Sequence, residues 1–398
     1  MRLRLFARAR RFSLLACAVV WVSSRLFAQS PNPAAGAAVA SVAQSADVAA
    51  RMQGFVERKE ISGAVTLVAH KGRVLRLDTV GEADLKTHRP MAKNTMFAIA
   101  SMTKPITATA IMILQDEGKL SVGDPVSKYL PEFKSATLAG RPPRREITLR
   151  DLMTHTSGVI GKQETEGTLR QTAEMLARRP LGFEPGTKWE YSPGLSICDR
   201  VIEVVSGQPY DAFLRDRIFR PLNMIDTTFH PTAGQRARAA RLYAIDKQSQ
   251  SLVPGKHWLF DVNDQTTPNP SGGLYSTASD LSRFYQMVLN RGELEGRRLL
   301  SAEAVRQMTT VQSGDLKTGF TPGCAWGLGW CIVREPQGAT KDLSPGSFGH
   351  GGAFGTQGWI DPQRQMIVVL LIQRIGVPNG DASDIRRSLQ EAAVAIVD

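Results

Sequence analysis

The stretch Ala98-Ile99-Ala100-Ser101-Met102-Thr103-Lys104-Pro105 is the point from which the rest of this chain can be interpreted. Apolar residues lead to a serine, a lysine follows three positions later, and a helical pattern begins there. Residues three apart on a helix share a face, so the Ser101 hydroxyl and the Lys104 amine point into the same space. A serine hydroxyl needs a neighbouring base to act as a nucleophile at neutral pH. The stretch therefore predicts a nucleophile and its activator on one turn.

Two neighbouring features support a helix that starts near Ser101. Pro105 is tolerated only in the first turn of a helix, and Gly118 is a C-terminal cap for the apolar run between them. A helix N-terminus also presents backbone N–H groups and a partial positive charge, which suit an oxygen that becomes an anion. The spacing alone is a weak signal, because a chain of this length contains roughly one Ser-x-x-Lys by chance. Ser101 is nevertheless the only serine with lysine at the third position after it.

Patterns typical of strands occur on both sides of this stretch, at the two ends of the chain. We expect a helix at 46–59 and a hairpin of strands 63–69 and 73–80. Towards the C-terminus we expect strands at 326–334, 347–359 and 366–373 and a closing helix at 381–397. Short connections between strands make the sheet antiparallel.

The middle of the chain, 119–300, is composed mostly of short helices and of loops rich in Pro and Gly. Thr148-Leu149-Arg150-Asp151 is a capping box, and helices are expected at 195–206 and from Thr277 to Asn290. The fold class is therefore α/β: an antiparallel sheet flanked by N- and C-terminal helices, with a mostly helical inserted domain. We assign 46–118 and 301–398 to the sheet domain and 119–300 to the insertion.

The N-terminus has the layout of a secretory signal peptide. Residues 1–11 are rich in arginine, 12–22 are almost wholly apolar, and a short flank ends at Ala28. The apolar segment is too short for a stable membrane span. We expect cleavage after Ala28, a flexible lead at 29–45, and a periplasmic or secreted protein. Two weaker alternatives are a twin-arginine signal at Arg10-Arg11-Phe12 and a lipid anchor at Cys17.

Composition excludes several function classes. The chain has 398 residues, 42% hydrophobic and 22% charged, which is ordinary for a globular protein. The formal net charge is +12, but six arginines of residues 1–28 account for half of it. Nucleic-acid binding needs a basic face with interleaved aromatic residues, and the scattered basic residues give none.

The odd number of cysteines left after cleavage argues against a disulfide framework. No metal-ligand spacing is found, and we expect no metal and no cofactor. The sequence does not determine the oligomeric state.

Three motifs in order along the chain carry a resemblance to a known family. Ser101-Met102-Thr103-Lys104 matches Ser-x-x-Lys, and Tyr191-Ser192-Pro193 matches a tyrosine motif. His350-Gly351-Gly352 stands where the family has a basic residue, one residue and a glycine on an edge strand. The sequence thus resembles the serine β-lactamase-related hydrolases: class C β-lactamases, penicillin-binding D,D-peptidases, D-aminopeptidases and esterases with the same β-lactamase/transpeptidase-like fold. Supporting stretches are 155–158, 184–186, 271–276 and 358–362, and the resemblance covers roughly 46–396.

The resemblance implies a role for each residue. Ser101 attacks an acyl carbonyl, and Lys104 and Tyr191 share the work of the general base, either as a tyrosine phenolate or as a neutral amine. The backbone N–H groups of Ser101 and Ala353 hold the oxyanion. Gly351 and Gly352 leave room for substrate beside the strand, and His350 polarises the site or meets a substrate carboxylate. Without the family, Tyr191 in its Pro- and Gly-rich loop is more simply a packed aromatic residue. Even within the family, His350 between glycines is more simply a turn histidine, and His155 pins a loop rather than moving a proton. Trp189, Trp326 and Trp330 belong to the core or to a pocket wall.

Two departures from the family bear on the substrate. Pro193 replaces the asparagine that hydrogen-bonds a substrate amide in β-lactamases and D,D-peptidases, and His350 replaces their lysine. Both favour a small-molecule ester or a D-amino-acid amide over a peptide or a β-lactam. We therefore expect an exported serine hydrolase that acts on esters through an acyl-enzyme. The alternatives are a D,D-peptidase or D-aminopeptidase with weak β-lactamase activity, and a penicillin-recognising scaffold without catalysis.

Overall fold

The structure is a computed structural model that describes residues 47–161, 167–260, 267–319, 321–377 and 383–398. The predicted signal peptide at 1–28 and the lead at 29–45 lie outside the described residues. Within the described ranges, no helix combines the length and the apolar character needed to span a membrane.

An antiparallel sheet of eight strands forms the centre of the fold, in the order β10-β11-β12-β13-β14-β1-β2-β3. Strands from both ends of the chain meet in it, because β1 pairs with β14 from Val65–Leu371 to His70–Met366. The predicted antiparallel α/β class is confirmed. The strand bounds are β1 Gly63–His70, β2 Arg73–Asp84, β3 Arg89–Pro90, β10 Cys324–Trp326, β11 Cys331–Val333, β12 Phe348–Gly351, β13 Gln357–Asp361 and β14 Met366–Leu371.

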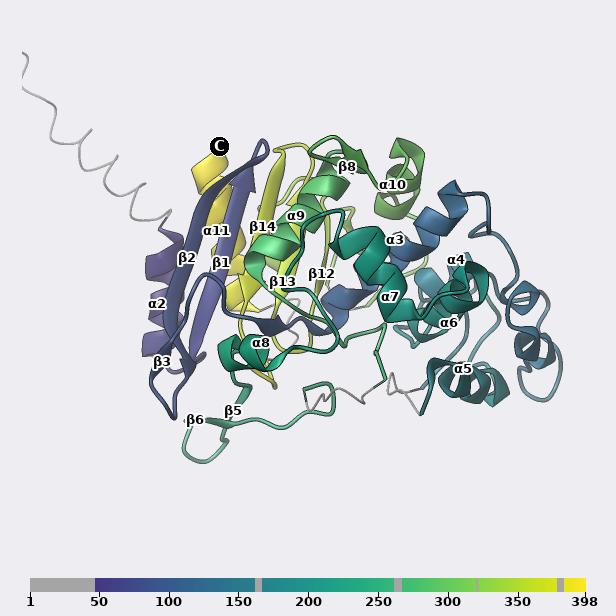
Figure 1. Cartoon of the computed structure of the whole chain (residues 1–398), viewed down its shortest axis with the longest axis horizontal. Helices are drawn as coiled ribbons and strands as arrows, with labels where there is room; N and C mark the ends of the chain where they lie inside the picture. Colours follow the sequence, from purple (N-terminus) through teal and green to yellow (C-terminus); the bar gives the residue numbers. More distant parts are fainter. Residues whose placement is uncertain (1–46, 162–166, 261–266, 320, 378–382) are drawn as a thin grey trace, which may run out of the picture. The chain divides into compact units, whose positions relative to one another are not determined.

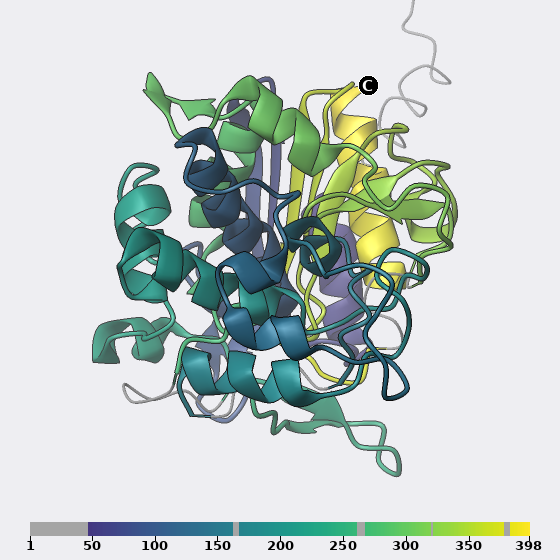
Figure 2. The ribbon, with the colours of Figure 1, turned by 90° about the vertical axis from the view of Figure 1, so that its right-hand side faces the viewer.

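Each face of this sheet packs against its own helices, because successive side chains of a strand point to opposite faces. On β1, Val65 and Leu67 belong to one apolar cluster, and Ala64 and Val68 belong to another. The second cluster is covered by α2, Val48–Glu57, and α11, Asp384–Val397. The first is covered by α9, Ala278–Leu289, and by the helices that follow the nucleophile turn. Figure 2 shows α11 on one side of the strands and, on the other, α9 and α3, Thr103–Asp116.

The helices at the two ends and the first hairpin lie where the sequence predicts them. Asp47 caps α2 by accepting hydrogen bonds from the N–H groups of Ala49 and Ala50, and Ser383 caps α11 in the same way. β1 and β2 pair as the expected hairpin. Figure 1 shows α2, α11 and these strands together, although they come from opposite ends of the chain.

Two predicted strands are wrong in their extent. The range 326–334 begins at the last residue of β10 and contains a turn and β11, because β10 and β11 pair as a hairpin with Trp326 opposite Cys331. The range 347–359 also holds a hairpin, β12 and β13, with the turn at 352–356. Both ranges contain glycines that permit a sharp reversal, such as Gly329 with φ of 77° and Gly355 with φ of 82°. Alternation of apolar residues across such a reversal resembles one continuous strand.

The middle of the chain carries short helices, as expected, and also short strand pairs that the sequence did not predict. The capping box at Thr148 and Asp151 is present and opens α4, and Gly207 ends α6 with φ of 69°. The bounds are α4 Leu149–Met153, α5 Leu169–Arg178, α6 Leu195–Ser206, α7 Tyr210–Leu214, η4 Arg215–Phe219, α8 Ala233–Arg238, β5 Tyr243–Ile245, β6 Leu252–Pro254, β7 Tyr275–Ser276, β8 Glu293–Leu294, β9 Arg297–Arg298 and α10 Ala302–Thr309. Short 3-10 turns are η2 Val126–Lys128, η3 Pro131–Ser135 and η5 Gly338–Thr340. Because α9 lies against β1, β13 and β14, the boundaries of the two domains remain a prediction.

The turn that carries Ser101 is placed by pairing with a distant segment. β4, Phe97–Ala98, pairs with β7, and the Ile99 N–H donates to the Leu274 carbonyl at 2.9 Å. A 3-10 turn, η1, Ala100–Met102, then leads into α3, Thr103–Asp116. Thr103 to Leu114 of α3 are all buried, so the helix runs through the interior, and the turn η1 that carries Ser101 lies against β12.

Candidate active site

Ser101 and Lys104 face each other, as their spacing predicts. Nζ of Lys104 lies 3.2 Å from Oγ of Ser101. Ser101 is half-buried, whereas the Lys104 side chain is fully buried. Ser101 lies in η1, one turn ahead of the α-helix, and the i, i+3 relationship survives because a 3-10 turn has three residues per turn. The hydroxyl is thus accessible while the amine behind it is screened from water.

Burial lowers the pKa of Lys104 well below its ordinary value of 10.5. Removing an ammonium group from water disfavours the charged form. Nζ donates to the Ser271 carbonyl at 2.7 Å, which leaves the lone pair of the neutral amine available for the Ser101 hydroxyl. Of the two bases that the sequence left open, the geometry supports the neutral amine.

Tyr191 reaches the same place from a different part of the chain. Nζ of Lys104 lies over the Tyr191 ring, 4.9 Å from its centroid. Tyr191 precedes α6 by a few residues, and α6 packs against α3. The structure therefore brings together the three residues predicted to be catalytic.

An aromatic cluster surrounds the Tyr191 ring. His155 lies 4.5 Å away between ring centroids, Trp326 6.1 Å, His350 6.2 Å and Trp189 6.4 Å. Trp189 and Trp326 therefore line the back of the site. The third predicted tryptophan, Trp330, packs instead on Phe284 and Phe348 in the main core.

The end of β12 lies directly against the nucleophile turn. A Cβ atom on Gly352 would lie 2.5 Å from the Ile99 carbonyl oxygen and 3.3 Å from Cβ of Ala100. Oγ1 of Thr356 donates to the same Ile99 carbonyl at 3.2 Å. Gly352 is thus a glycine because no side chain fits there. Ala353 follows it as an exposed residue of the turn beside Ser101.

The strand that carries His350 is not an edge strand over its whole length, which corrects the sequence-based assignment. β12 pairs with β13 on one side and with β11 on the other. The β11 pairing, however, covers only Phe348 and Gly349. Among the described strands, His350 and Gly351 therefore have a neighbour on the β13 side alone, and the other side of β12 is open next to Ser101.

The His350 side chain is buried, and its Nδ1 lies 2.6 Å from the Gly351 carbonyl oxygen. A carbonyl only accepts hydrogen bonds, so Nδ1 carries a hydrogen. In the neutral ring, Nε2 is then an acceptor. The contact holds the imidazole against its own strand, and both predicted roles of His350, polarising the site and meeting a substrate carboxylate, stay predictions.

Strain is present immediately before the nucleophile. Ala100 has φ of 45°, a left-handed conformation that costs an L-residue about 1–2 kcal/mol. Oγ1 of Thr103 donates to the Ala100 carbonyl at 2.7 Å and compensates in part. The strained residue turns Ser101 out of the buried helix towards β12.

Ser271 is the contributor that the sequence reasoning did not assign. Its carbonyl accepts from Lys104, and its hydroxyl lies 2.8 Å from that of Ser196 on α6. The stretch 271–276 was noted only as a supporting motif. No side-chain pattern indicates a backbone carbonyl as an acceptor, so only the fold could identify it.

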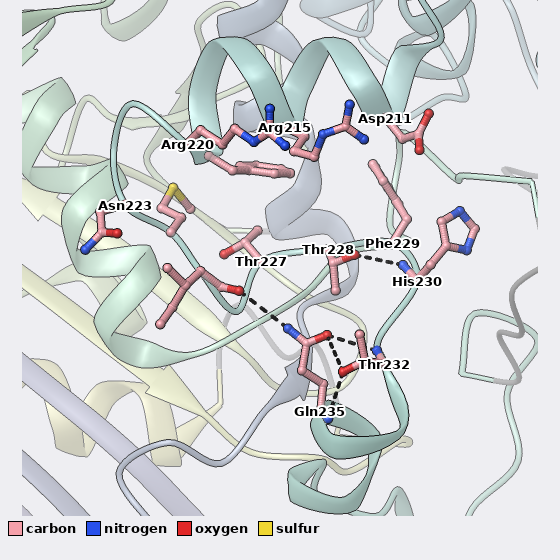
Figure 3. A pocket seen from close by; sticks show the side chains of 13 residues that line it. Asp211, Arg215, Arg220, Asn223, Thr227, Thr228, Phe229, His230, Thr232 and Gln235 are labelled. Atoms are coloured by element: carbon pink, nitrogen blue, oxygen red, sulfur yellow. Dashed lines mark hydrogen bonds between the residues drawn. The ribbon is translucent and has the colours of Figure 1, made fainter.

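A hollow of about 440 Å³ lies elsewhere on the protein, and none of the active-site residues described above lines it. Figure 3 shows it between Arg215 and Arg220 on one side and Thr232 and Gln235 on the other. Its polar groups are engaged locally: Gln235 bonds to Thr232 in a capping box, and both arginines pair with Asp216. In the described part of the chain, no three His, Cys, Asp or Glu side chains are grouped as ligands for a metal ion.

Comparison with known proteins places the chain in a family. The family model described as Beta-lactamase matches residues 48–393. Protein Rv1367c of Mycobacterium tuberculosis is 34% identical over 348 residues, covering 79% of this chain and 86% of that protein. Esterase EstB of Burkholderia gladioli is 30% identical over 369 residues, covering 82% of this chain and 91% of EstB.

Among solved structures, EstCE1, a hydrolase with promiscuous acyltransferase activity, is similar with a TM-score of 0.78. The identity is 24%, and the match covers 90% of this chain and 99% of EstCE1. This similarity confirms the fold. The match to the family model over most of the described residues confirms the resemblance drawn from the three motifs. The chain belongs to the Beta-lactamase family, and it is a serine hydrolase.

Proposed function

We propose that this protein hydrolyses small-molecule carboxylic esters through an acyl-enzyme formed on Ser101. The observation that carries the proposal is the contact between Oγ of Ser101 and the fully buried Nζ of Lys104 at 3.2 Å. A neutral amine at that distance is a competent general base for a serine hydroxyl.

The first half of the reaction forms the acyl-enzyme. Lys104 takes the proton of Ser101 as Oγ attacks the ester carbonyl, and the carbonyl oxygen becomes an oxyanion. The N–H groups of Ser101 and Ala353 stabilise that charge from either side of the gap between η1 and β12. The C–O bond to the alcohol then breaks, and the alcohol leaves with the proton held by Lys104, with Tyr191 beside it as a second proton donor.

The second half repeats these steps with water. Lys104 accepts a proton from the water as it attacks the acyl-enzyme, and Ser101 leaves with that proton. The acid is released and the free enzyme is restored. Every step uses side chains of this chain and the water itself.

The surroundings favour an ester over a peptide or a β-lactam. Pro193, next to the tyrosine motif, has no side-chain group with which to bond a substrate amide. His350 donates its Nδ1 hydrogen to its own neighbour, the Gly351 carbonyl. An ester needs neither of the missing contacts, and esterase EstB is one of the relatives.

The proposal is tested with the purified protein and three substrates: a p-nitrophenyl short-chain ester, a chromogenic cephalosporin and a D-Ala-D-Ala peptide. We expect ester turnover that falls at least about 10³-fold in Ser101→Ala. The matched control is Ser135→Ala, because Ser135 is an exposed serine whose hydroxyl bonds only to the nearby Glu132 carbonyl.

The other outcomes identify the alternatives. Turnover of the peptide or the cephalosporin in preference to the ester favours the D,D-peptidase or D-aminopeptidase function. Inertness towards all three substrates favours a penicillin-recognising scaffold, and a covalent penicillin adduct measured by mass spectrometry would then identify the ligand.

We also propose that the protein is exported and cleaved after Ala28. The support is the arginine-rich start and the apolar segment at 12–22. Mass spectrometry of the protein recovered from the periplasm or medium should give a chain that begins at Gln29. A full-length chain in the cytoplasm, or a lipid on Cys17, would overturn this proposal.

A further inference from the structure

We propose that His155 is a positioning residue for Tyr191, which fixes the backbone on both sides of the tyrosine so that its ring faces Lys104. The inference rests on the proposed function, since it concerns the geometry of the same site. It goes beyond that function by giving His155 a specific task and a specific chemical form.

His155 is hydrogen-bonded to both neighbours of Tyr191. Its Nδ1 accepts from the Ser192 N–H at 3.1 Å and lies 3.2 Å from the Ser192 hydroxyl. Its carbonyl accepts from the Glu190 N–H at 3.0 Å. One residue at the end of α4 thus holds the segment before and after the tyrosine.

These contacts require the neutral ring. Because a backbone N–H can only donate, Nδ1 must be unprotonated, and the hydrogen lies on Nε2. Burial lowers the pKa of His155 well below its ordinary value. Protonating Nδ1 would place two donors opposite each other and break the contact with Ser192.

The ring also supports Tyr191 directly. The two ring centroids are 4.5 Å apart, and on its other sides the imidazole packs edge-on against Trp326 and Trp189 at 5.1 Å and 6.1 Å. His155 is fully buried, so this packing leaves the Tyr191 ring little freedom to move away from Lys104.

The backbone conformation at position 155 does not by itself favour a histidine. His155 has φ of 60° directly after α4 and its cap Thr154, a conformation that glycine or asparagine adopts more readily. In addition, Nε2 of His155 has no hydrogen-bond partner among the described residues. A residue chosen only to end the helix would have neither cost, so the imidazole serves the contacts with Ser192 and with the Tyr191 ring.

Two amide variants separate positioning from general packing. His155→Asn places its carbonyl oxygen where Nδ1 lies and keeps the acceptor for Ser192. His155→Gln has the same chemistry, but its oxygen reaches the place of Nε2 instead. We expect His155→Asn to keep kcat on the p-nitrophenyl ester within about threefold, and His155→Gln to lose about 10- to 100-fold in kcat with KM changed less than about twofold. A merely structural role would lower the amount of folded protein in both variants and leave kcat per active site unchanged.

The proposal is wrong if folded His155→Gln has the kcat of the parent protein, or if His155→Asn loses as much as His155→Gln. Should His155→Gln fail to fold, Ser192→Ala removes the hydroxyl contact alone. A loss of about threefold in its kcat is then expected, and an unchanged kcat would count against positioning.

A readout that does not depend on turnover separates this proposal from the proposed function. If the parent protein does not hydrolyse the ester in a Ser101-dependent way, the proposed function fails. Crystal structures of the two amide variants still test His155. The Tyr191 ring should keep its 4.9 Å distance to Nζ of Lys104 in His155→Asn and shift by about 1 Å or more in His155→Gln. An unmoved ring in His155→Gln would overturn the proposal.

Discussion

The backbone carbonyl of Ser271 accepts a hydrogen bond from Nζ of Lys104 at 2.7 Å, although the two residues are 167 positions apart. A neutral amine has two hydrogens and one lone pair. One of these hydrogens is committed to Ser271, and the lone pair of a neutral amine can accept from the Ser101 hydroxyl, which lies 3.2 Å away. The carbonyl therefore orients the base, and burial of Lys104 supplies its neutral form.

Lys104→Met should abolish catalysis while leaving a folded protein, because methionine matches the length of the buried stem. General-base catalysis is worth about 10²–10⁴-fold, so we expect kcat/KM on the ester to fall by about 10³-fold. The control is Lys128→Met, since Lys128 is an exposed lysine paired with Asp124. A Lys104→Met protein with more than a tenth of the parent activity would contradict the assignment.

The pH profile of kcat/KM should report the lowered pKa of Lys104. Only the neutral amine is a base, so activity rises with pH through that pKa and levels off well below 10.5, the ordinary value for lysine. The measurement is kcat/KM for the ester across the alkaline range that the substrate tolerates. A limb that continues to rise up to pH 10.5 would show that Lys104 is charged in the free enzyme.

Stability should depend on pH through the same residue. The unfolded chain binds a proton at Lys104 up to its ordinary pKa of 10.5, whereas the folded protein loses it at lower pH. The free energy of unfolding therefore rises with pH between the two values, by up to about 1.4 kcal/mol per pH unit. Urea unfolding at several pH values should show this rise in the parent protein and in Lys128→Met, and its absence in Lys104→Met.

Gly352→Ala should separate β12 from the nucleophile turn. The new Cβ would lie 2.2 Å from Oγ1 of Thr356 and 2.5 Å from the Ile99 carbonyl oxygen, so one of the two segments must move. We expect a loss of about 1–3 kcal/mol in the free energy of unfolding and a fall of about 10²-fold in kcat. Gly234→Ala is the control, because no atom lies within 4 Å of the corresponding position in α8. Equal kcat in the two variants would argue against an oxyanion site at this contact.

Asp280→Asn should stabilise the protein at neutral pH. Burial raises the pKa of Asp280 from 3.8 to about 6, so the folded protein keeps a proton that the unfolded chain releases. The free energy of unfolding therefore falls as pH rises from about 4 to about 6. Asparagine has no proton to lose and can still accept from the Asp226 N–H and the Thr227 hydroxyl, which now bond to Oδ2.

The expected gain at pH 7 is up to about 3 kcal/mol, the equivalent of the shift in pKa. Urea unfolding at pH 4, 5, 6 and 7 measures it, with Asp315→Asn as the control, because that side chain is 99% exposed. A pH dependence that persists in Asp280→Asn would mean that another group is responsible.

Sequence patterns predicted a feature correctly where the interactions that form it join residues close together in the sequence. The capping box at Thr148, the glycine that ends α6 and the spacing of Ser101 and Lys104 depend on neighbours within a few residues. The two glycine-rich ranges near the C-terminus were assigned wrongly because a hairpin and a long strand share the same alternation.

By itself, the sequence determined the order of helices and strands, the antiparallel sheet and the three motifs that place the chain in its family. Tertiary structure alone decided how Tyr191, Ser271 and the end of β12 converge on Ser101. The same is true of the lowered pKa of Lys104, since a pKa depends on burial, and burial depends on segments far away in the chain. A motif names the groups that can react, but the free energy of their charged forms is set by everything packed around them.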